Sequence, residues 1–495
     1  MTDFMKNIFY RSLCALLFAA LFAACKKDDS CNVSFPIAGA FVNDWGESAT
    51  VVFETVNVSS VEVSATNGWS GSADLSTHRM TVTAPENEDV ENAKKSAVFT
   101  ITAKSPAGTT STATLNAYII AETTDLSAEG TSNCYIVTQP DAKYKFNVNF
   151  KGESYERLAT ASVGIVWETA SALIRYLVLD KDGYAEFYVS YDNNSDTELR
   201  EGNAVVAAYN DAGDIIWSWH LWLTNSDPRT EEGVETYQNG ATFMNRNLGS
   251  FANSGGSTET SEILASYGLY YQWGRKDPFP RPRYYNCANN YTESLYNGSG
   301  SYVNMIIEET DAEKGTVAYA TAHPDTFLSA PESNNGDWLY GRRDDSLWGD
   351  STGSGNKSLY DPCPKGWEVP AGSDFMNLEL AEADDTMELD QAKKTYGWFL
   401  TDRGGSRHFY TGAGYRSYFD GILSNVNYKD QYPYTPVPWV GYYWTQGTDG
   451  ANGVAMFFDL NTSRATINAF EPQTQQYRAN GMQVRCVKTE RSVIR

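Results

Sequence analysis

The stretch from Asp361 to Pro370 (Asp-Pro-Cys-Pro-Lys-Gly-Trp-Glu-Val-Pro) constrains this chain more than any other feature. Two prolines flank Cys363, and because proline fixes φ and holds the preceding residue extended, a rigid segment presents this cysteine. Cys486 lies in an alternating stretch, Gly481 to Val487, that is typical of a last strand. We expect these two cysteines to form a disulfide worth roughly 3 to 5 kcal/mol in the chain-entropy model. The alternative is two buried free thiols.

The first residues indicate an exported lipoprotein. Lys6 and Arg11 precede an apolar run, Leu13 to Ala24, that is too short to span a bilayer and has the size of a signal-peptide core. The run ends in Leu-Phe-Ala-Ala-Cys25, which resembles a bacterial lipobox. In such signals the cysteine is acylated and begins the mature protein, so we expect Cys25 to carry the lipid.

The next four residues bear on the location of the protein. Lys-Lys-Asp-Asp (26–29) resembles the charged signal that sends Bacteroidota lipoproteins to the outer face of the outer membrane. We therefore predict a signal peptide (1–24), an acylated tether (25–30) and an outer-membrane, surface-exposed lipoprotein. The alternatives are an ordinary secretory peptide and a lipoprotein that faces the periplasm.

Composition favours β-rich domains and excludes some partners. The 495 residues include 32 Tyr, 13 Trp and 39 Gly, and a chain of this length predicts roughly two to four domains. The formal net charge is −24. A chain this acidic, without a basic patch, is a poor nucleic-acid binder, and it is not attracted electrostatically to anionic lipids.

Five cysteines remain beyond the signal peptide and the lipid site. They are Cys31, Cys134, Cys287, Cys363 and Cys486. An exported protein can form disulfides, but an odd count leaves at least one thiol unpaired. The pairing of Cys31, Cys134 and Cys287 is open.

Residues 31–125 are expected to form an immunoglobulin-like β-sandwich. Five short alternating stretches are separated by turn residues, a pattern typical of such a sandwich. These stretches are Ala49–Phe53, Ser60–Ser64, Met80–Thr83, Ala97–Thr102 and Ser111–Leu115. Trp69 is interpreted as a tryptophan that closes the sandwich, with a ligand platform as the alternative.

A second β domain is predicted for residues 126–240, although the sequence leaves open whether it folds separately or forms the base of the terminal domain. Its most informative segment is Ile215–Leu223 (Ile-Ile-Trp-Ser-Trp-His-Leu-Trp-Leu). Apolar residues occupy both faces at period two, which indicates a strand buried on both sides. We therefore interpret His220 as a hydrogen-bonded core histidine rather than a metal ligand.

No catalytic motif is recognisable. The four histidines (His78, His220, His323 and His408) lack metal-ligand spacing, and there is no phosphate-binding glycine loop, nucleophile elbow or zincin motif. We therefore expect a protein that is not an enzyme. A carbohydrate-active enzyme stays an alternative, because two glycosidase carboxylates can meet in space without a sequence signature.

Aromatic and polar loops after residue 241 are the candidate binding surface. Flat aromatic rings can stack on sugars, and Asn and Asp oxygens can bind hydroxyls or Ca²⁺. The candidates are Asn335, Asp337, Trp338, Asp344, Asp345, Trp348, Tyr443 and Trp444. No cofactor is required, and Ca²⁺ is the one metal these residues suggest, although an EF-hand pattern is missing. The alternatives are a protein-binding surface and tryptophans that fill the core of a loop-rich domain.

An ordered set of motifs resembles a known family. They are Cys134-Tyr-Ile-Val, Ile216-Trp-Ser-Trp-His, Met244-Asn-Arg-Asn-Leu, Gly268-Leu-Tyr-Tyr-Gln-Trp-Gly-Arg-Lys-Asp-Pro, the Asp361–Pro370 stretch, Gly412-Ala-Gly-Tyr-Arg, Tyr443-Trp-Thr and Val484-Arg-Cys-Val. Together they resemble the Fibrobacter succinogenes major paralogous domain family of Bacteroidota surface lipoproteins and fimbrial-type proteins. The resemblance covers about residues 131–490.

Residues 241–495 also resemble, more loosely, the α+β C-type-lectin-like fold, which has an early helix, long loops and a bridge to the last strand. We expect the helix from Ser373 to about Ala383. The fold class predicted for the whole chain is therefore mainly β, with an N-terminal β-sandwich followed by a loop-rich α+β domain.

These observations predict a lipid-anchored surface protein for binding or adhesion. Its partners would be the outer membrane, through the lipid, and a glycan or a surface protein, through the C-terminal loops. The first alternative is a fimbria-associated or tip subunit that contacts other fimbrial subunits, and the second is a carbohydrate-active enzyme.

Overall fold

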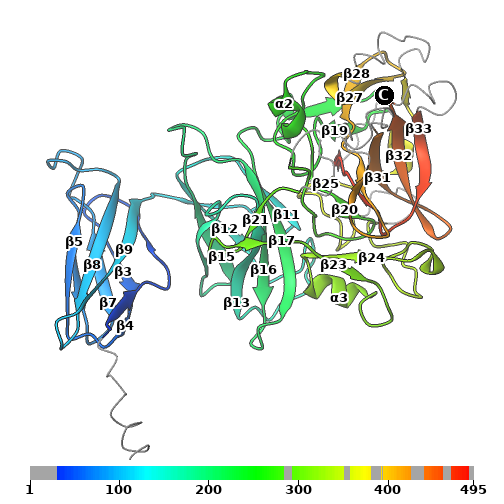
Figure 1. Ribbon diagram of the computed structural model, residues 1–495. Coiled ribbons are helices and arrows are strands. Elements are labelled where there is room, and N and C mark those ends of the chain that lie inside the picture. The colour runs from blue at the N-terminus through cyan, green and yellow to red at the C-terminus, as the bar shows by residue number, and fades with distance from the viewer. Residues whose placement is uncertain are drawn as a thin grey trace, which may run out of the picture. The chain divides into compact units, whose positions relative to one another are not determined.

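The protein is mainly β and divides into two compact units, residues 1–123 and 124–495 (Figure 1). The computed structural model describes residues 30–283, 292–349, 357–380, 392, 394–424, 440–460 and 470–489. Cys25, Cys287 and the N-terminal signal lie outside these residues. No helix within the described ranges is long and apolar enough to cross a membrane.

The first unit is the expected β-sandwich. Its strands are β1 (Asn32–Ser34), β2 (Gly39–Val42), β3 (Ser48–Val52), β4 (Glu54–Val56), β5 (Ser60–Ala65), β6 (Ser70–Asp74), β7 (Arg79–Thr83), β8 (Ser96–Lys104) and β9 (Thr110–Ile119). They form sheets of order β2-β9-β8-β5 and β3-β7-β6, and β1 pairs with β4. Strands β3, β5, β7, β8 and β9 confirm the five predicted strands.

Trp69 belongs to the core of this sandwich. Its side chain is 5% exposed, packs edge-on against Phe99 and donates its indole N–H to the Lys94 carbonyl at 2.9 Å. Burial of a large ring with its one donor satisfied is a packing role. The interpretation of Trp69 as a sandwich-closing residue is therefore confirmed.

The second unit begins with two further sheets. One has the order β10-β12-β15-β14 and the other β11-β17-β16-β13-β21-β22. The strands are β10 (Thr123–Asp125), β11 (Cys134–Val137), β12 (Ala142–Asn147), β13 (Ser162–Glu168), β14 (Arg175–Leu179), β15 (Tyr184–Val189), β16 (Gly202–Tyr209), β17 (Ile215–Leu223), β21 (Leu295–Tyr296) and β22 (Tyr302–Val303).

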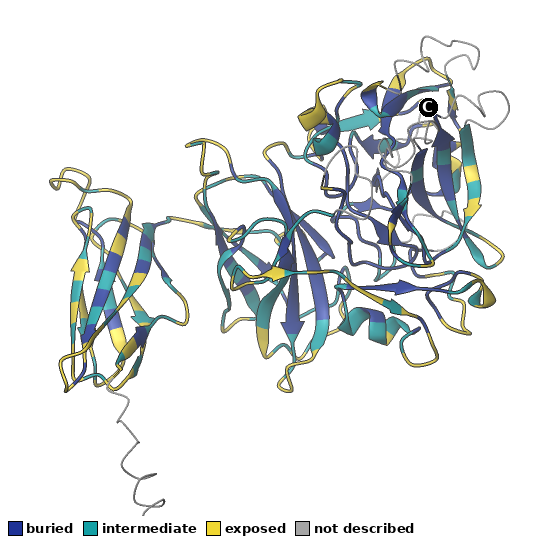
Figure 2. Cartoon of the chain, viewed as in Figure 1, coloured by how far each residue is buried: buried dark blue, intermediate teal, exposed yellow. Residues whose placement is uncertain are grey.

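The middle of the six-stranded sheet is buried on both faces, as Figure 2 shows for β16 and β17. On one face, Trp217, Trp219 and Leu221 pack with the four-stranded sheet. On the other face, Cys134 and Trp222 belong to a core cluster that extends to Cys486. The predicted double burial of β17 is confirmed, and this sheet is the base on which the C-terminal residues pack.

The remaining chain forms small sheets joined by long loops. Their strands are β18 (Val234–Thr236), β19 (Thr242–Met244), β20 (Tyr271–Gln272), β23 (Ile306–Glu309), β24 (Thr326–Ser329), β25 (Trp367–Glu368), β26 (Leu378–Leu380), β27 (Gly397–Asp402), β28 (Arg407–Thr411), β29 (Tyr415–Arg416), β30 (Leu423–Ser424), β31 (Val440–Asp449), β32 (Asn452–Asp459), β33 (Phe470–Gln476), β34 (Gly481–Met482) and β35 (Val487–Lys488). The short helices are η1 (Glu231–Gly233), α2 (Thr260–Ala265), α3 (Val317–Ala322), η2 (Glu332–Asn334) and α4 (Gly372–Phe375).

The predicted helix after Ser373 is wrong beyond its first turn. Helix α4 ends at Phe375, and β26 then pairs with β27, so sheet pairing replaces the expected helix. The Ala371 amide at the helix start donates to the Asp374 carboxylate at 2.8 Å. The expected residues 381–383 lie outside the described ranges.

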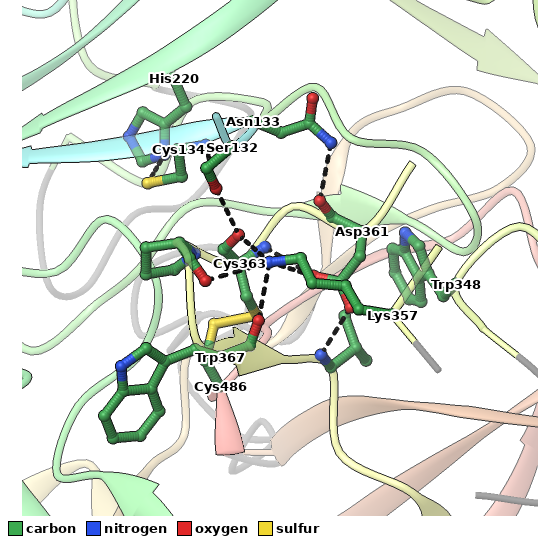
Figure 3. The surroundings of a disulfide bond; sticks show 12 residues. Ser132, Asn133, Cys134, His220, Trp348, Lys357, Asp361, Cys363, Trp367 and Cys486 are labelled. Carbon is green, nitrogen blue, oxygen red and sulfur yellow. Dashed lines mark hydrogen bonds and ion pairs between the residues drawn. A yellow bond between two sulfur atoms is a disulfide. The ribbon is translucent and has the colours of Figure 1, made fainter. Parts of the chain in front are cut away.

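The predicted disulfide between Cys363 and Cys486 is present, with the two Cα atoms 6.0 Å apart (Figure 3). The Lys357 ammonium holds the cysteine segment by donating to the carbonyls of Cys363, Pro364 and Trp367 at 2.5, 3.0 and 2.7 Å. Ser132, just before β11, donates to the Cys363 carbonyl at 3.2 Å. The disulfide segment is thereby joined to the six-stranded sheet.

Candidate functional site

The three tryptophans predicted to bind a ligand lie in the core instead. Trp338, Trp348 and Trp444 are at most 1% exposed. Their indole N–H groups donate to the carbonyls of Trp273, Arg275 and Tyr271 at 2.8, 3.2 and 2.8 Å. A ring without exposed surface cannot stack on a sugar, so these three predictions are corrected. The indoles instead satisfy backbone carbonyls in a core built from loops.

Tyr443 is corrected for the same reason. Its ring is fully buried, and its hydroxyl donates to the Thr411 carbonyl at 2.7 Å. Asn335 ends η2 in the left-handed region, with φ of 54°. Asn335 is exposed whereas Tyr443 is buried, so the two residues do not form one binding surface.

The three aspartates bind parts of their own chain. Asp337 accepts from the Leu339 amide at 3.0 Å, and burial raises the pKa of Asp337 to about 6. Asp344 accepts from the Ser346 amide at 2.9 Å, and Asp345 pairs with Arg343 at 3.0 Å and also with Arg478. Within the described ranges no group of three His, Cys, Asp or Glu residues could hold a metal ion. These carboxylates are thus engaged by amides and guanidinium groups.

A groove elsewhere in the second unit is the candidate site. It has a volume of about 660 Å³ and is open to solvent. Four separate segments line it: residues 151–159, residues 210–217 at the turn into β17, helix α3, and Tyr360. The lining residues are Lys151, Arg157, Leu158, Ala159, Asn210, Ile215, Ile216, Trp217, Val317, Ala318, Thr321, Ala322 and Tyr360.

The aromatic part of the groove wall is tightly packed. The rings of Trp217 and Tyr360 are 5.7 Å apart between centroids. Trp217 is 1% exposed and donates its indole N–H to Asn133 Oδ1 at 3.1 Å. The Lys151 ammonium lies 5.8 Å from the centre of the Trp217 ring. These contacts hold the wall in one arrangement before any ligand arrives.

Helix α3, which lies beside β17 in Figure 1, also lines the groove. Polar groups hold both of its ends. At its start, Thr316 Oγ1 accepts from the Tyr319 amide at 3.1 Å, which is an N-cap. At its end, Arg275 donates to the carbonyls of Ala320 and His323, both at 3.3 Å. Burial lowers the pKa of Arg275 to about 10, so it stays charged at neutral pH. A cation at this end also complements the helix dipole.

The Lys-Asp pair that follows Arg275 supports β17. Lys276 and Asp277 form a buried ion pair of 2.7 Å, and the Lys276 ammonium donates to the Ser218 carbonyl at 3.0 Å. Ser218 in turn donates its hydroxyl to Asp277 at 2.6 Å. The Gly-Arg-Lys-Asp-Pro motif therefore positions two walls of the groove, although none of its residues lines it.

A Cys-His-Asn arrangement lies in the same sheet. Cys134 Sγ is 3.4 Å from His220 Nδ1, and His220 Nε2 is 2.9 Å from Asn203 Oδ1. All three side chains are at most 2% exposed. Burial raises the pKa of Cys134 to about 12 and lowers the pKa of His220 to about 3. Both groups are therefore neutral, the opposite of the thiolate that nucleophilic catalysis requires. The interpretation of His220 as a hydrogen-bonded core residue is confirmed.

Sequence reasoning missed the groove. Its residues come from segments between Lys151 and Tyr360, and each segment looks locally like an ordinary strand, helix or turn. The Gly-Arg-Lys-Asp-Pro motif (274–278) was the sequence signal closest to the groove, because three consecutive charged residues stand in an otherwise aromatic stretch. In the structure these charges are buried and support α3 and β17.

Neither a protein-family model nor a curated protein sequence matches the chain. Among solved structures, the D00-D0 domain of intimin aligns at 13% identity over 39% of this chain and 96% of that chain, with a TM-score of 0.15. The Bacteroides ovatus protein SGBP-B, in complex with a mixed-linkage heptasaccharide, aligns at 8% identity over 40% and 48%, with a TM-score of 0.12. The tandem Ig repeats of Dlar align at 12% identity over 39% and 97%, with a TM-score of 0.14. TM-scores this low carry no functional conclusion.

Proposed function

We propose that this protein is a lipid-anchored binding protein of the bacterial cell surface, and that it captures its ligand in the groove between β17 and α3. The observation that carries the proposal is a preformed, solvent-open groove of about 660 Å³ with apolar walls and two cationic residues. Concave sites of this size with a few polar groups are the usual form of ligand sites. The lipobox-like sequence that ends at Cys25 supports the location.

The groove favours binding over hydrolysis of a sugar. Asp and Glu are missing from its described lining residues, so it lacks the pair of carboxylates that a glycosidase uses. Ca²⁺ has no role in this proposal, because the predicted calcium ligands are engaged elsewhere.

The location is tested by replacing the acylated residue. The full-length chain and its Cys25→Ser variant are produced in a Gram-negative host that processes lipoproteins. We expect the wild-type chain in the outer-membrane fraction and accessible to protease added to intact cells, and the variant released from the membrane. A variant that stays in the membrane fraction would contradict a lipid anchor at Cys25.

The groove is tested by filling it. Ala318 lies on the exposed side of α3 and lines the groove, so Ala318→Trp places an indole in the ligand's position. Ala312 is exposed just before α3 and does not line the groove, so Ala312→Trp is the matched control. Ligands found on glycan and peptide arrays should lose binding to the first variant only. Ligands that bind both variants equally would rule out the groove.

A further inference from the structure

The groove follows the edge of strand β17. Side chains alternate between the two faces of a strand, so a pocket on one face meets every second residue. Here the consecutive residues Ile215, Ile216 and Trp217 all line the groove. A groove that meets three residues in a row lies along the strand's edge and its backbone.

Part of that edge has no strand beside it. Strand β11 pairs with β17 in parallel register only from His220 to Leu223. Among the described residues, no strand pairs with the first half of β17 on this side, and β16 covers the other side. The Ser218 carbonyl on β17 accepts from Lys276, and the stretch before it, Ile215–Trp217, lines the groove. An extended chain can add to such an edge through main-chain hydrogen bonds.

The side chains around this edge select for aliphatic groups. Leu158, Ile216, Val317, Ala318 and Ala322 contribute apolar surface to the groove. When an aliphatic group of a ligand replaces water here, binding is stabilised by roughly 25 cal/mol for each Å² of apolar surface that is buried. A ligand that supplies only hydroxyl groups does not gain this term.

The charges of the groove select for carboxylates. Arg157 and Lys151 lie on one side, and the described lining has no acidic residue to oppose them. Lys151 is paired with Glu156 at 2.5 Å, whereas the Arg157 guanidinium lies 5.2 Å from the centre of the Phe150 ring. Glu156 offsets the charge of Lys151, so Arg157 is the cation of the lining that can meet a carboxylate of an anionic partner.

Two neutral polar side chains of the groove, Asn210 and Thr321, are already engaged. Asn210 Oδ1 accepts from the amides of Ala212 and Asp214, and Thr321 donates to the Val317 carbonyl at 2.8 Å. Trp217 has too little exposed surface for stacking. A sugar needs many hydrogen-bonding partners, and with these groups engaged the groove offers it fewer of them.

We propose that the groove binds an extended segment of a partner protein, in which aliphatic side chains alternate with Asp or Glu, and that the segment adds to β17 at Ile215–Trp217. This inference rests on the proposed function, because it names the ligand class of the same groove. The aliphatic side chains pack against α3 and Leu158, and a carboxylate meets Arg157.

The test measures the binding of three peptides to the full-length chain purified in detergent. One probe alternates glutamate with leucine, and two others have every glutamate replaced by glutamine or by lysine. We expect the glutamate peptide to bind best and to weaken as salt rises, because screening reduces attraction between charges. Hydrogen exchange at the amides of Ile215 and Ile216 should slow when this peptide is bound. Equal binding of the glutamate and lysine peptides, or unchanged exchange at these amides, would overturn the inference.

Variants separate this inference from the proposed function. Arg157→Glu should lower the affinity for the glutamate peptide by roughly tenfold, which is the usual effect of losing one charged hydrogen bond. Arg79→Glu, at an exposed position of strand β7 in the first unit, makes the same charge change and should leave binding unaltered. If a glycan array instead yields ligands that Ala318→Trp abolishes, the groove function stands and the peptide inference fails. If no peptide or glycan responds to Ala318→Trp, both fail.

Discussion

The Lys276 ammonium lies 4.6 Å from the centre of the Trp217 ring, so a buried charge supports the wall of the candidate groove. The Lys276 ammonium is also paired with Asp277 at 2.7 Å, and both side chains are at most 5% exposed. Breaking a buried ion pair on one side leaves an uncompensated charge. We expect Lys276→Met to lower the free energy of unfolding by about 3 kcal/mol. The measurement is chemical denaturation of the protein, followed by the tryptophan signal of the second unit.

A double-mutant cycle checks the cause of that loss. The double variant Lys276→Met with Asp277→Leu removes both charges, so it should be more stable than Lys276→Met alone. A double variant that loses the sum of the two single effects would show that the pair itself is not the origin.

The disulfide should contribute strongly to the stability of the second unit. Cys363 and Cys486 are separated by 123 positions, so the bridge restricts a long loop of the unfolded chain. We expect Cys363→Ser to destabilise the fold by about 3 to 5 kcal/mol and to make it insensitive to reductant. Cys31, a free cysteine in the first unit, is the control position, and Cys31→Ser should keep the wild-type response to reductant. Equal melting temperatures of wild type with and without reductant would contradict this.

Glu168 should make stability depend on pH. Its carboxylate is buried and accepts from the amides of Ala172 and Ile174 at 2.7 and 3.0 Å, and burial raises the pKa of Glu168 from 4.5 to about 7. The folded state therefore holds the proton more tightly than the unfolded chain. The stabilisation is fully present below pH 4.5 and is lost as the pH rises through about 7.

The Glu168→Gln variant isolates this effect. Between about pH 5 and about pH 8, the free energy of unfolding of wild type should fall by on the order of 2 kcal/mol more than that of the variant, because the glutamine does not ionise. The measurement is chemical denaturation of both proteins at each pH. Parallel pH profiles would assign the dependence to other groups, such as Asp337.

Replacing the core tryptophans should change stability rather than ligand recognition. Trp338 and Trp444 are at most 1% exposed, so Trp338→Ala or Trp444→Ala removes packed volume and should cost about 3 to 5 kcal/mol. Tyr302 is 75% exposed, and Tyr302→Ala should change stability by less than about 0.5 kcal/mol. A folded, equally stable Trp444→Ala protein that loses ligand binding would restore the original surface prediction.

Cys134 should be unreactive in the native protein. Its thiol is 1% exposed, and burial raises its pKa to about 12, so little thiolate forms at neutral pH. Iodoacetamide should modify Cys31 in the folded protein, and it should modify Cys134 only after denaturation. Mass spectrometry of the digested chain separates the two sites. Rapid native labelling of Cys134 would show that the Cys-His-Asn arrangement opens to solvent.

Sequence by itself determined the features that depend on local pattern. Period-two alternation placed β17 and five strands of the first unit (β3, β5, β7, β8 and β9), because neighbouring side chains decide which face a strand buries. The prolines around Cys363 and the alternation around Cys486 were enough to propose the disulfide that the structure contains. Composition likewise indicated the mainly β class.

Only the tertiary structure decided which of these features meet. The local sequence around Trp338 and Trp444 is compatible both with a core position and with a sugar-binding surface. Other loops bury both rings, and they therefore belong to the core. The groove exists because Arg157, Ile216, Ala318 and Tyr360 converge from four segments. Convergence depends on packing between distant parts of the chain, and local periodicity carries no record of it.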